Sequence, residues 1–367
     1  MASLYDQLRV AFVRCPRHAC ERAVSLALVA AAPPSSMSYF LRRLILYSIL
    51  AAALAFGFER LLRVEFSTHD PARSAILVTG ASSGIGRAAA LALAQKGYLV
   101  YAGVRSPTFS SEFSKLNARL RPIVIDVAKP EQIEAAVTAL SGEFADQKPW
   151  RRVSLVGIVN NAGTTLKRPL ETVPLEDVQS LWDVNVMGAL RVSQAFAPML
   201  RASKGRIVNV GSVQGCVTLP MWGPYALTKY AVEALSDGLR QELEPFGISV
   251  SLVSPGYVNT ELRGKGVPSN KSLTTTERDQ YYSRFAAMWK KDAELIKLSP
   301  PCCAETDAAI VHAMTDPFPR TRYYPFTANV KFGPLFPAWL ASMLLRATSV
   351  HPLLDRLKDK VIWVTGS

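Results

Sequence analysis

The chain passes from a short apolar run into a glycine-rich turn at Ala75-Ile76-Leu77-Val78-Thr79-Gly80-Ala81-Ser82-Ser83-Gly84-Ile85-Gly86. Alanine and leucine, which favour helices, dominate residues 87–94. In a strand, turn and helix of this kind, the glycines let the backbone approach a pyrophosphate, and the first N–H groups of the helix carry the positive end of its dipole. The segment therefore predicts a dinucleotide-binding turn.

Other apolar runs of strand length recur along the chain and alternate with helical stretches. They occupy residues 98–105, 123–127, 154–160, 206–211 and 248–253. This alternation predicts an α/β fold with a single Rossmann-type doubly wound parallel sheet and helices on both faces, preceded by an N-terminal hydrophobic helix. Apolar residues make up 49% of the 367, which is ample for the core of one such domain, placed at residues 73–325.

Three polar residues downstream of the turn suggest catalysis. Tyr225 and Lys229 are four positions apart, so a helix would place the phenol and the ammonium on one face. A nearby cation lowers the pKa of a phenol from about 10 towards the range useful for general acid–base catalysis. Ser212 follows the run at 206–211, at the carboxyl end of a strand, where open α/β sheets bind ligands. A Tyr–Lys pair alone is common on helices, but together with the glycine turn it indicates hydride transfer.

The order of these motifs over residues 73–260 resembles the short-chain dehydrogenase/reductase family, most of all its branch of 17β-hydroxysteroid and retinol dehydrogenases. The resemblance implies an NAD(P)-dependent enzyme with a catalytic tetrad of Asn185, Ser212, Tyr225 and Lys229. Tyr225 would exchange a proton with the substrate oxygen, which Ser212 would polarise. Lys229 would also bind the ribose hydroxyls of the cofactor, and Asn185 would hold a water on a proton path.

The same resemblance implies which residues contact the cofactor. They come from the glycine turn, the ends of the second and third strands, the segment Asn160-Asn161-Ala162-Gly163, the tetrad and a Pro-Gly loop. The expected set is Gly80, Ser82, Ser83, Gly84, Ile85, Gly86, Arg105, Asp126, Asn161, Ala162, Gly163, Tyr225, Lys229, Pro255, Gly256 and Thr260.

The end of the second strand bears on the choice between NADP(H) and NAD(H). In Rossmann folds an acid there binds the ribose 2′-hydroxyl of NAD, whereas an arginine accommodates the 2′-phosphate of NADP. Residues 98–105 contain no acid and end in Arg105, so NADP(H) is favoured. NAD(H) stays possible, because Arg105 could be a solvated surface residue and Ser83, just before Gly84, is not basic.

Several other chemistries are disfavoured by the sequence. The four histidines are scattered, and the five cysteines match no zinc pattern, so we expect no metal and reduced thiols. The segment at 211–215 misses the spacing of a serine hydrolase nucleophile by one residue. The net charge of +13 is spread along the chain without a basic block, which favours contact with anionic lipid or cofactor phosphates over nucleic acid.

An uncharged apolar run at residues 44–58 precedes the domain. A membrane span needs about 20 apolar residues, and Tyr39-Phe40-Leu41 and Leu61-Leu62 extend the run towards that length. We therefore expect a membrane-anchor helix at 37–65, with membrane contact through 39–62; a peripheral or core helix and a cleaved targeting segment are the alternatives. Residues 1–36 resemble a flexible or organelle-targeting extension, unless Met37 is the true start. We expect a location at the endoplasmic reticulum, and cofactor supply and the free cysteines favour a cytosol-facing catalytic domain.

Residues 260–300 correspond to the substrate lid of the family. Tyr282, Phe285 and Trp289 recur there at helical spacing and would cover a hydrophobic ligand or pack on the sheet. Residues 326–367 form a proline-interrupted apolar segment and tail, which leaves a homodimer possible. With the anchor, these features favour an NADP(H)-preferring oxidoreductase of a lipophilic alcohol and its ketone or aldehyde, such as a steroid, retinoid or long-chain lipid. The alternatives are an NAD-dependent retinol or steroid dehydrogenase working oxidatively, and a non-catalytic cofactor-binding scaffold, against which the complete tetrad argues.

Overall fold

The computed structural model describes residues 47, 64–107, 113, 115–147, 152–216, 218–256, 258 and 303–325. The chain divides into two units, residues 1–64 and 65–367, and the fold described below belongs to the second. The expected anchor at 37–65 lies almost entirely outside the described residues, as do Thr260, the lid at 260–300 and the tail at 326–367. Among the helices that the structure describes, none is long and apolar enough to cross a membrane.

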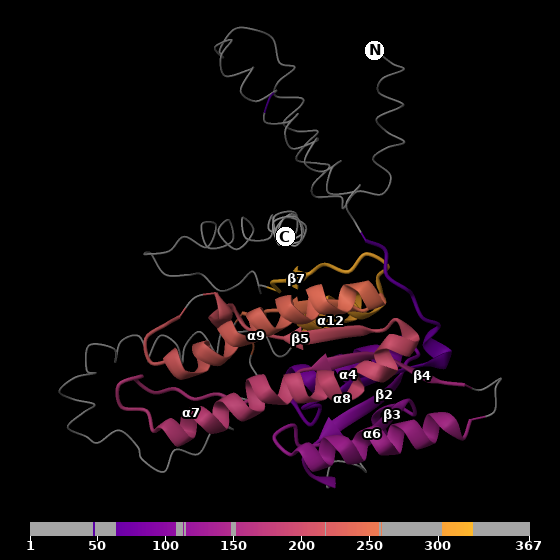
Figure 1. Cartoon of the computed structure of the whole chain (residues 1–367), viewed down its shortest axis with the longest axis horizontal. Coiled ribbons are helices and arrows are strands. Elements are labelled where there is room, and N and C mark those ends of the chain that lie inside the picture. The colour runs from indigo at the N-terminus through magenta and orange to yellow at the C-terminus, as the bar shows by residue number, and fades with distance from the viewer. Residues whose placement is uncertain are drawn as a thin grey trace, which may run out of the picture. The chain divides into compact units, whose positions relative to one another are not determined.

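Within the described residues, seven parallel strands form one sheet (Figure 1). In spatial order they are β3 Leu120–Val124, β2 Leu99–Val104, β1 Ser74–Val78, β4 Ser154–Asn160, β5 Arg206–Val210, β6 Ser249–Val253 and β7 Arg322–Tyr323. Every neighbouring pair is parallel, which confirms the predicted sheet. The strand order reverses between β1 and β4, and the carboxyl ends of these two strands form the crevice where such sheets bind ligands.

Helices cover both faces of this sheet, as the sequence predicted (Figure 1). One face is covered by α4 Gly84–Gln95 and α12 Ala304–Thr315, which pack on each other as well as on the strands. The other face is covered by α6 Pro130–Ala145, α8 Gly188–Ser203 and α9 Gly223–Leu243. A shorter helix, α7 Leu175–Trp182, runs into α8 through a π-helical turn at Asp183–Met187. Short 3-10 turns lie at Pro71–Arg73, Val213–Gly215 and Glu244–Phe246.

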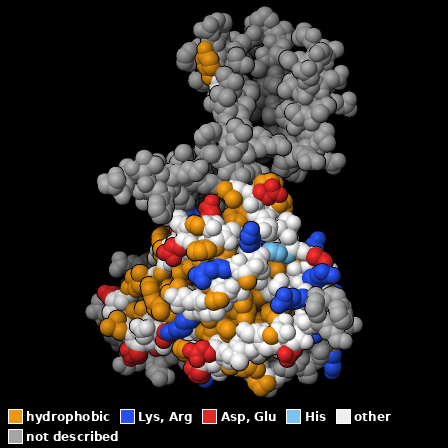
Figure 2. Space-filling view, turned by 45° about the vertical axis from the view of Figure 1, so that its right-hand side comes forward, with side chains coloured by type: hydrophobic (Ala, Val, Ile, Leu, Met, Phe, Trp, Pro, Cys, Tyr) orange, Lys and Arg blue, Asp and Glu red, His pale blue; other side chains and the backbone are white. Residues whose placement is uncertain are grey.

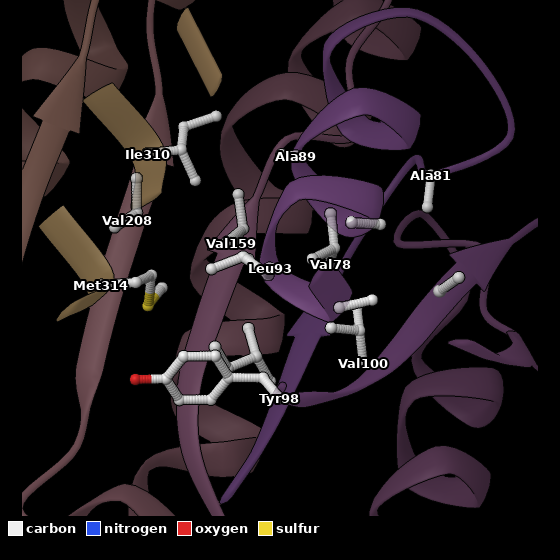
Figure 3. Close-up of a cluster of buried hydrophobic side chains, with 14 of the residues drawn as sticks. Val78, Ala81, Ala89, Leu93, Tyr98, Val100, Val159, Val208, Ile310 and Met314 are labelled. Carbon is white, nitrogen blue, oxygen red and sulfur yellow. The ribbon is translucent and has the colours of Figure 1, made fainter. Parts of the chain in front are cut away.

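The core has two layers because successive side chains of a strand point to opposite faces. Figure 3 shows the layer under α4 and α12, where Leu93 and Met314 meet the strand residue Val159. Leu93 and Val159 are fully buried, and burial of each such side chain contributes ~1.5–3 kcal/mol. Gly157 in β4 makes room for α12, since a Cβ there would lie 2.7 Å from the sulfur of Met314.

A buried arginine holds the segment before β1 and the end of α12 in place. Arg206, the first residue of β5, is 1% exposed. Its guanidinium donates to the carbonyl oxygens of Ala313 at 2.9 Å, Asp316 at 2.6 Å and Ser67 at 2.9 Å. These bonds compensate a charge that would be costly to bury unpaired. They tie the segment before β1 and the end of α12 to the amino-terminal edge of the sheet, opposite the ligand-binding edge.

Two sequence-based expectations need correction. The run at 123–127 was expected to be a strand, but β3 ends at Val124. The chain turns at Asp126, whose Oδ1 accepts from the N–H of Ala128 at 3.1 Å; such a side-chain bond competes with strand pairing. The cysteines were expected to be reduced, which holds for the free Cys216 but is wrong for Cys303, which is disulfide-bonded.

Candidate active site

The turn between β1 and α4 uses glycine where other residues would be strained or would clash. Gly80 and Gly84 have φ of 64° and 56°, in the left-handed region. A Cβ at Gly86 would lie 2.3 Å from both the Nδ2 of Asn161 and the O of Gly80. Ser83, the N-cap of α4, makes no side-chain cap hydrogen bond, so it does not occupy the first amides of the helix. The backbone can therefore approach a pyrophosphate, and these residues fit a dinucleotide cofactor.

Asn161, directly after β4, supports the glycine turn. Its Nδ2 donates to the carbonyl oxygens of Thr79 at 2.9 Å and Gly80 at 3.1 Å. The hydroxyl of Thr79 accepts from the backbone N–H groups of Asn161 and Ala162, both at 3.0 Å. These bonds join the ends of β1 and β4 at the switch point. The carboxamide of Asn161, expected to contact the cofactor, is thus engaged by the protein itself.

A pocket lies at the carboxyl ends of the strands, beside the glycine turn. It brings together the helix that carries the Tyr–Lys pair, the serine after β5 and the Pro-Gly loop after β6. The expected site residues that line it are Ile85, Asn161, Gly163, Ser212, Tyr225, Lys229, Pro255 and Gly256.

Lys229 is buried in the wall of this pocket. The side chain is 6% exposed, its Nζ donates to the carbonyl oxygen of Val210 at 2.9 Å, and Nζ lies 5.6 Å from the centroid of the Tyr225 ring. Burial lowers the pKa of Lys229 to about 8, because a buried ammonium loses its hydration. The helical spacing of four thus places the cation beside the phenol ring, as expected.

Ser212 is held at the end of β5 by the turn that it begins. Its Oγ accepts from the N–H of Gln214 at 3.2 Å and caps the 3-10 turn at Val213–Gly215. The N–H of Val213 donates to the carbonyl oxygen of Pro255 at 3.0 Å. The serine turn and the Pro-Gly loop are therefore joined directly, and both face the same pocket.

Asn185 lies in the π-helical turn and is 3% exposed. Its Oδ1 accepts from the N–H of Thr164 at 2.8 Å, and its Nδ2 donates to the O of Thr164 at 3.0 Å and to the hydroxyl of Thr228 at 2.9 Å. Thr228 stands between Tyr225 and Lys229 in sequence. The carboxamide of Asn185 thus fixes the segment after β4 against α9. Irregular π turns of this kind are frequent at functional sites.

The remaining expected cofactor residues lie outside the pocket lining. Ser82 and Ser83 are half-buried in the glycine turn. Arg105 is exposed just after β2, and Asp126 is half-buried just after the neighbouring β3. The N–H of Asp126 donates to the Oε1 of Gln132 at 2.8 Å. Arg105 and Asp126 therefore lie at the carboxyl edge of β2 and β3, beside the glycine turn.

Sequence reasoning missed several residues of the pocket wall, namely Thr164, Thr165, Val210, Gly211, Val213, Gln214, Trp222 and Val258. Trp222 packs edge-on against Tyr225, with ring centroids 5.9 Å apart, and the ammonium of Lys167 lies 5.4 Å from the Trp222 ring. The signal for Trp222 was its position three residues before Tyr225, the candidate catalytic residue. Within the described ranges, no cluster of three or more His, Cys, Asp or Glu residues could hold a metal ion.

Comparison with known proteins identifies the family of the chain. Residues 74–270 match the short chain dehydrogenase family. The chain is 33% identical over 270 residues to mitochondrial D-beta-hydroxybutyrate dehydrogenase of Rattus norvegicus, covering 68% of this chain and 76% of that protein. It is also 33% identical over 291 residues to retinol dehydrogenase 16 of Mus musculus, covering 76% and 89%. A short-chain dehydrogenase of Streptomyces avermitilis shares the fold with a TM-score of 0.59, at 26% identity over 78% of this chain and 98% of that one.

The chain belongs to the short-chain dehydrogenase/reductase family. It is an NAD(P)-dependent oxidoreductase that interconverts alcohols and ketones. The retinol dehydrogenase among the relatives agrees with the branch inferred from the sequence.

Proposed function

We propose that this enzyme prefers NADP(H) and acts on a lipophilic alcohol and its ketone or aldehyde, such as a steroid, a retinoid or a long-chain lipid. The observation that carries the proposal is the pocket that brings Ser212, Tyr225 and Lys229 together beside the glycine turn. When bound, the nicotinamide cofactor supplies or accepts hydride. The residues of this chain then have to hold the substrate oxygen and move its proton.

Tyr225 is the proposed general acid–base. Its side chain is 8% exposed and lines the pocket, with Lys229 beside the ring. While the Lys229 ammonium is charged, it favours the phenolate and so eases proton transfer between Tyr225 and the substrate oxygen. Ser212 donates a hydrogen bond to the same oxygen in our assignment. Asn185 supports the arrangement by holding Thr164 and Thr228 in place.

The preference for NADP(H) rests on the end of β2. Arg105 follows Val104 there, and its side chain is exposed. An arginine in this position can pair with a 2′-phosphate, whereas NAD-dependent relatives of this fold class use an acid to bind the 2′-hydroxyl. Asp126, the acid nearest to this edge in our assignment, follows β3, and its Oδ1 accepts from the N–H of Ala128. We therefore assign the 2′-phosphate to Arg105.

The lipophilic substrate is supported by the apolar part of the pocket wall, which includes Ile85, Trp222 and Val258. Membrane contact through 39–62, a location at the endoplasmic reticulum with a cytosol-facing domain, and a homodimer remain predictions from the sequence. On the face drawn in Figure 2, basic and acidic side chains are interspersed with apolar ones. Such a mixture favours a small-molecule partner over nucleic acid.

The test is turnover by the full chain in detergent micelles, with NADPH and NADH in parallel. The substrates are a retinoid aldehyde, a steroid ketone, a long-chain aldehyde and acetoacetate. We expect NADPH-dependent turnover of a lipophilic carbonyl, abolished by Tyr225→Phe. If acetoacetate were the only compound of this panel that is turned over, the assignment of a lipophilic substrate would be refuted. Stoichiometric cofactor binding without turnover would favour the scaffold.

Arg105→Gln tests the cofactor assignment separately. We expect the KM for NADPH to rise about tenfold or more, since one charge-assisted contact to the phosphate is lost, while the KM for NADH stays within about twofold. Lys96→Gln, at the exposed end of α4, is the matched loss of charge and should leave both values unchanged. A wild-type preference for NADH would refute the role of Arg105 and favour the oxidative NAD-dependent alternative.

A further inference from the structure

A buried group of charged residues lies behind the pocket, one helical turn beyond Lys229. Its central member is Glu233 of α9, whose side chain is 14% exposed. Carboxylates are rarely buried to this extent without partners. The residues around Glu233 come from three separate segments, namely the start of β7, the end of β6 and the serine turn.

Two polar contacts hold the Glu233 carboxylate, and the Sγ of Cys216 adds a longer one to its Oε1 at 3.9 Å. Its Oε2 lies 3.2 Å from the Nε of Arg322 in β7. Its Oε1 accepts from the hydroxyl of Ser254 at 3.0 Å. Ser254 directly precedes Pro255 and Gly256, which line the pocket. Glu233 therefore connects the helix that carries Tyr225 and Lys229 to the loop whose Pro255 and Gly256 line the same pocket.

The arginine of this pair is held in its turn by a second carboxylate. The Nη2 of Arg322 lies 2.7 Å from the Oδ1 of Asp237, which also accepts from the Nη1 of Arg240 at 2.7 Å. The side chain of Arg322 is 13% exposed. Burial raises the pKa of Glu233 and Arg322 opposes the rise, so the arginine favours the charged form that accepts from Ser254.

The serine turn is shaped around the same group. A Cβ at Gly215 would lie 3.1 Å from the Cγ of Glu233, and a Cβ at Gly211 would lie 2.9 Å from the Oγ of Ser254. Gly211, directly before Ser212, and Gly215, at the end of the serine turn, thus allow the turn to pack closely on both residues. A shift of Glu233 would move the loop and the serine turn together.

We propose that Glu233, oriented by Arg322, is a positioning residue that fixes the Ser254-Pro255-Gly256 loop and thereby sets the affinity for the nicotinamide half of the cofactor. The proposal rests on the proposed function, because the Pro-Gly loop faces the nicotinamide in that assignment. An ordinary structural ion pair would also lower stability when broken. The two roles differ in which part of the cofactor is affected, since in the proposed function the glycine turn and Arg105 would hold the adenosine half, away from this loop.

The experiment compares two ligands on the full chain in detergent, by fluorescence or calorimetric titration. NADPH occupies both halves of the site, whereas 2′,5′-ADP occupies the adenosine half alone. In Glu233→Gln and in Ser254→Ala we expect the Kd for NADPH to rise about tenfold, the effect of losing one charge-assisted hydrogen bond. The Kd for 2′,5′-ADP should stay within about twofold of the wild-type value. Ser254→Ala is the smaller change and keeps the test available if Glu233→Gln fails to fold.

Asp237→Asn is the matched control, because it removes a carboxylate of the same ion-pair group without touching Ser254. It should lower the melting temperature and leave the Kd for NADPH within about twofold. The proposal would be overturned if Glu233→Gln and Ser254→Ala lost affinity equally for NADPH and for 2′,5′-ADP. It would also be overturned if their affinity for NADPH were unchanged. Failure of the wild-type chain to bind NADPH or NADH would instead refute the proposed function, so the two failures are distinguishable.

Discussion

The buried ammonium of Lys229 should lower the free energy of unfolding relative to a variant with an uncharged side chain at this position. Burial lowers the pKa of Lys229 from 10.5 to about 8. Because a difference of one in pKa corresponds to about 1.36 kcal/mol, the charged group costs the folded protein about 3 kcal/mol. Lys229→Met keeps most of the side-chain volume and removes this cost. It also removes the hydrogen bond to Val210, which contributes about 1 kcal/mol.

The expected net effect at pH 7 is therefore stabilisation of the cofactor-free protein by about 2 kcal/mol. For a domain of this size the melting temperature should rise by about 4–8 °C. The sign depends on pH, because the folded pKa lies below the unfolded one. The cost is fully present below pH 8 and is relieved as the pH rises from about 8 to 10.5. The advantage of Lys229→Met should therefore shrink over that range.

The assay is thermal and urea unfolding of the wild type and Lys229→Met, followed by circular dichroism at pH 7 and pH 10. Lys115→Met, at an exposed lysine, is the control and should change stability by less than about 0.5 kcal/mol. Lys229→Met should also lose turnover. An unchanged or lowered unfolding free energy at pH 7, or an advantage that grows towards pH 10, would refute the reasoning from burial.

Two further perturbations test the geometry of the site. Gly86→Ala places a Cβ 2.3 Å from the Nδ2 of Asn161. We therefore expect at least tenfold weaker NADPH binding in a titration and a free energy of unfolding lowered by about 1–3 kcal/mol. Gly142→Ala, with open space around it, is the control and should leave binding unchanged. Burial, together with the nearby charge of Glu233, raises the pKa of the free Cys216 thiol. At pH 7 iodoacetamide should therefore alkylate Cys216 more slowly than it alkylates the thiol of glutathione, as measured by peptide mass spectrometry. Glu233→Gln should speed the alkylation of Cys216. Equal alkylation rates for Cys216 and glutathione would contradict the assigned environment of the thiol.

The sheet was predictable because it depends on local patterns. The apolar runs at 154–160 and 206–211 coincide closely with β4 and β5, since buried parallel strands read as continuous apolar runs. The end of β3 was misplaced because Ile125 and Val127 are buried although they follow the strand. Burial and strand pairing normally coincide, and a turn at a single aspartate separates them here.

Motif spacing led to the candidate residues Ser212, Tyr225 and Lys229, which line one pocket, but it gave no sign of the contacts that support them. Arg322 lies 89 positions from Glu233 in the sequence, and Arg206 lies 139 positions from Ser67. In sequence each of these arginines reads as an ordinary surface charge, because arginine is mostly exposed in proteins. Their burial follows from the register of β5, β6 and β7, which the two-residue length of β7 hides from pattern analysis.

Helix α9 explains why the proposed catalytic pair, Tyr225 and Lys229, and the proposed positioning residue occur together. Tyr225, Lys229, Glu233 and Asp237 are spaced by four and lie along one side of the helix, facing in turn the pocket, β5, the end of β6 and β7. A lysine and a glutamate at this spacing can pair on an isolated helix. Here Ser254 and Arg322 engage Glu233 instead, and the pKa of Lys229 is lowered by burial. In the proposed assignment, Arg322 therefore favours the charged Glu233 that accepts from Ser254, and because Glu233 is paired with Arg322, the Lys229 charge is left for Tyr225.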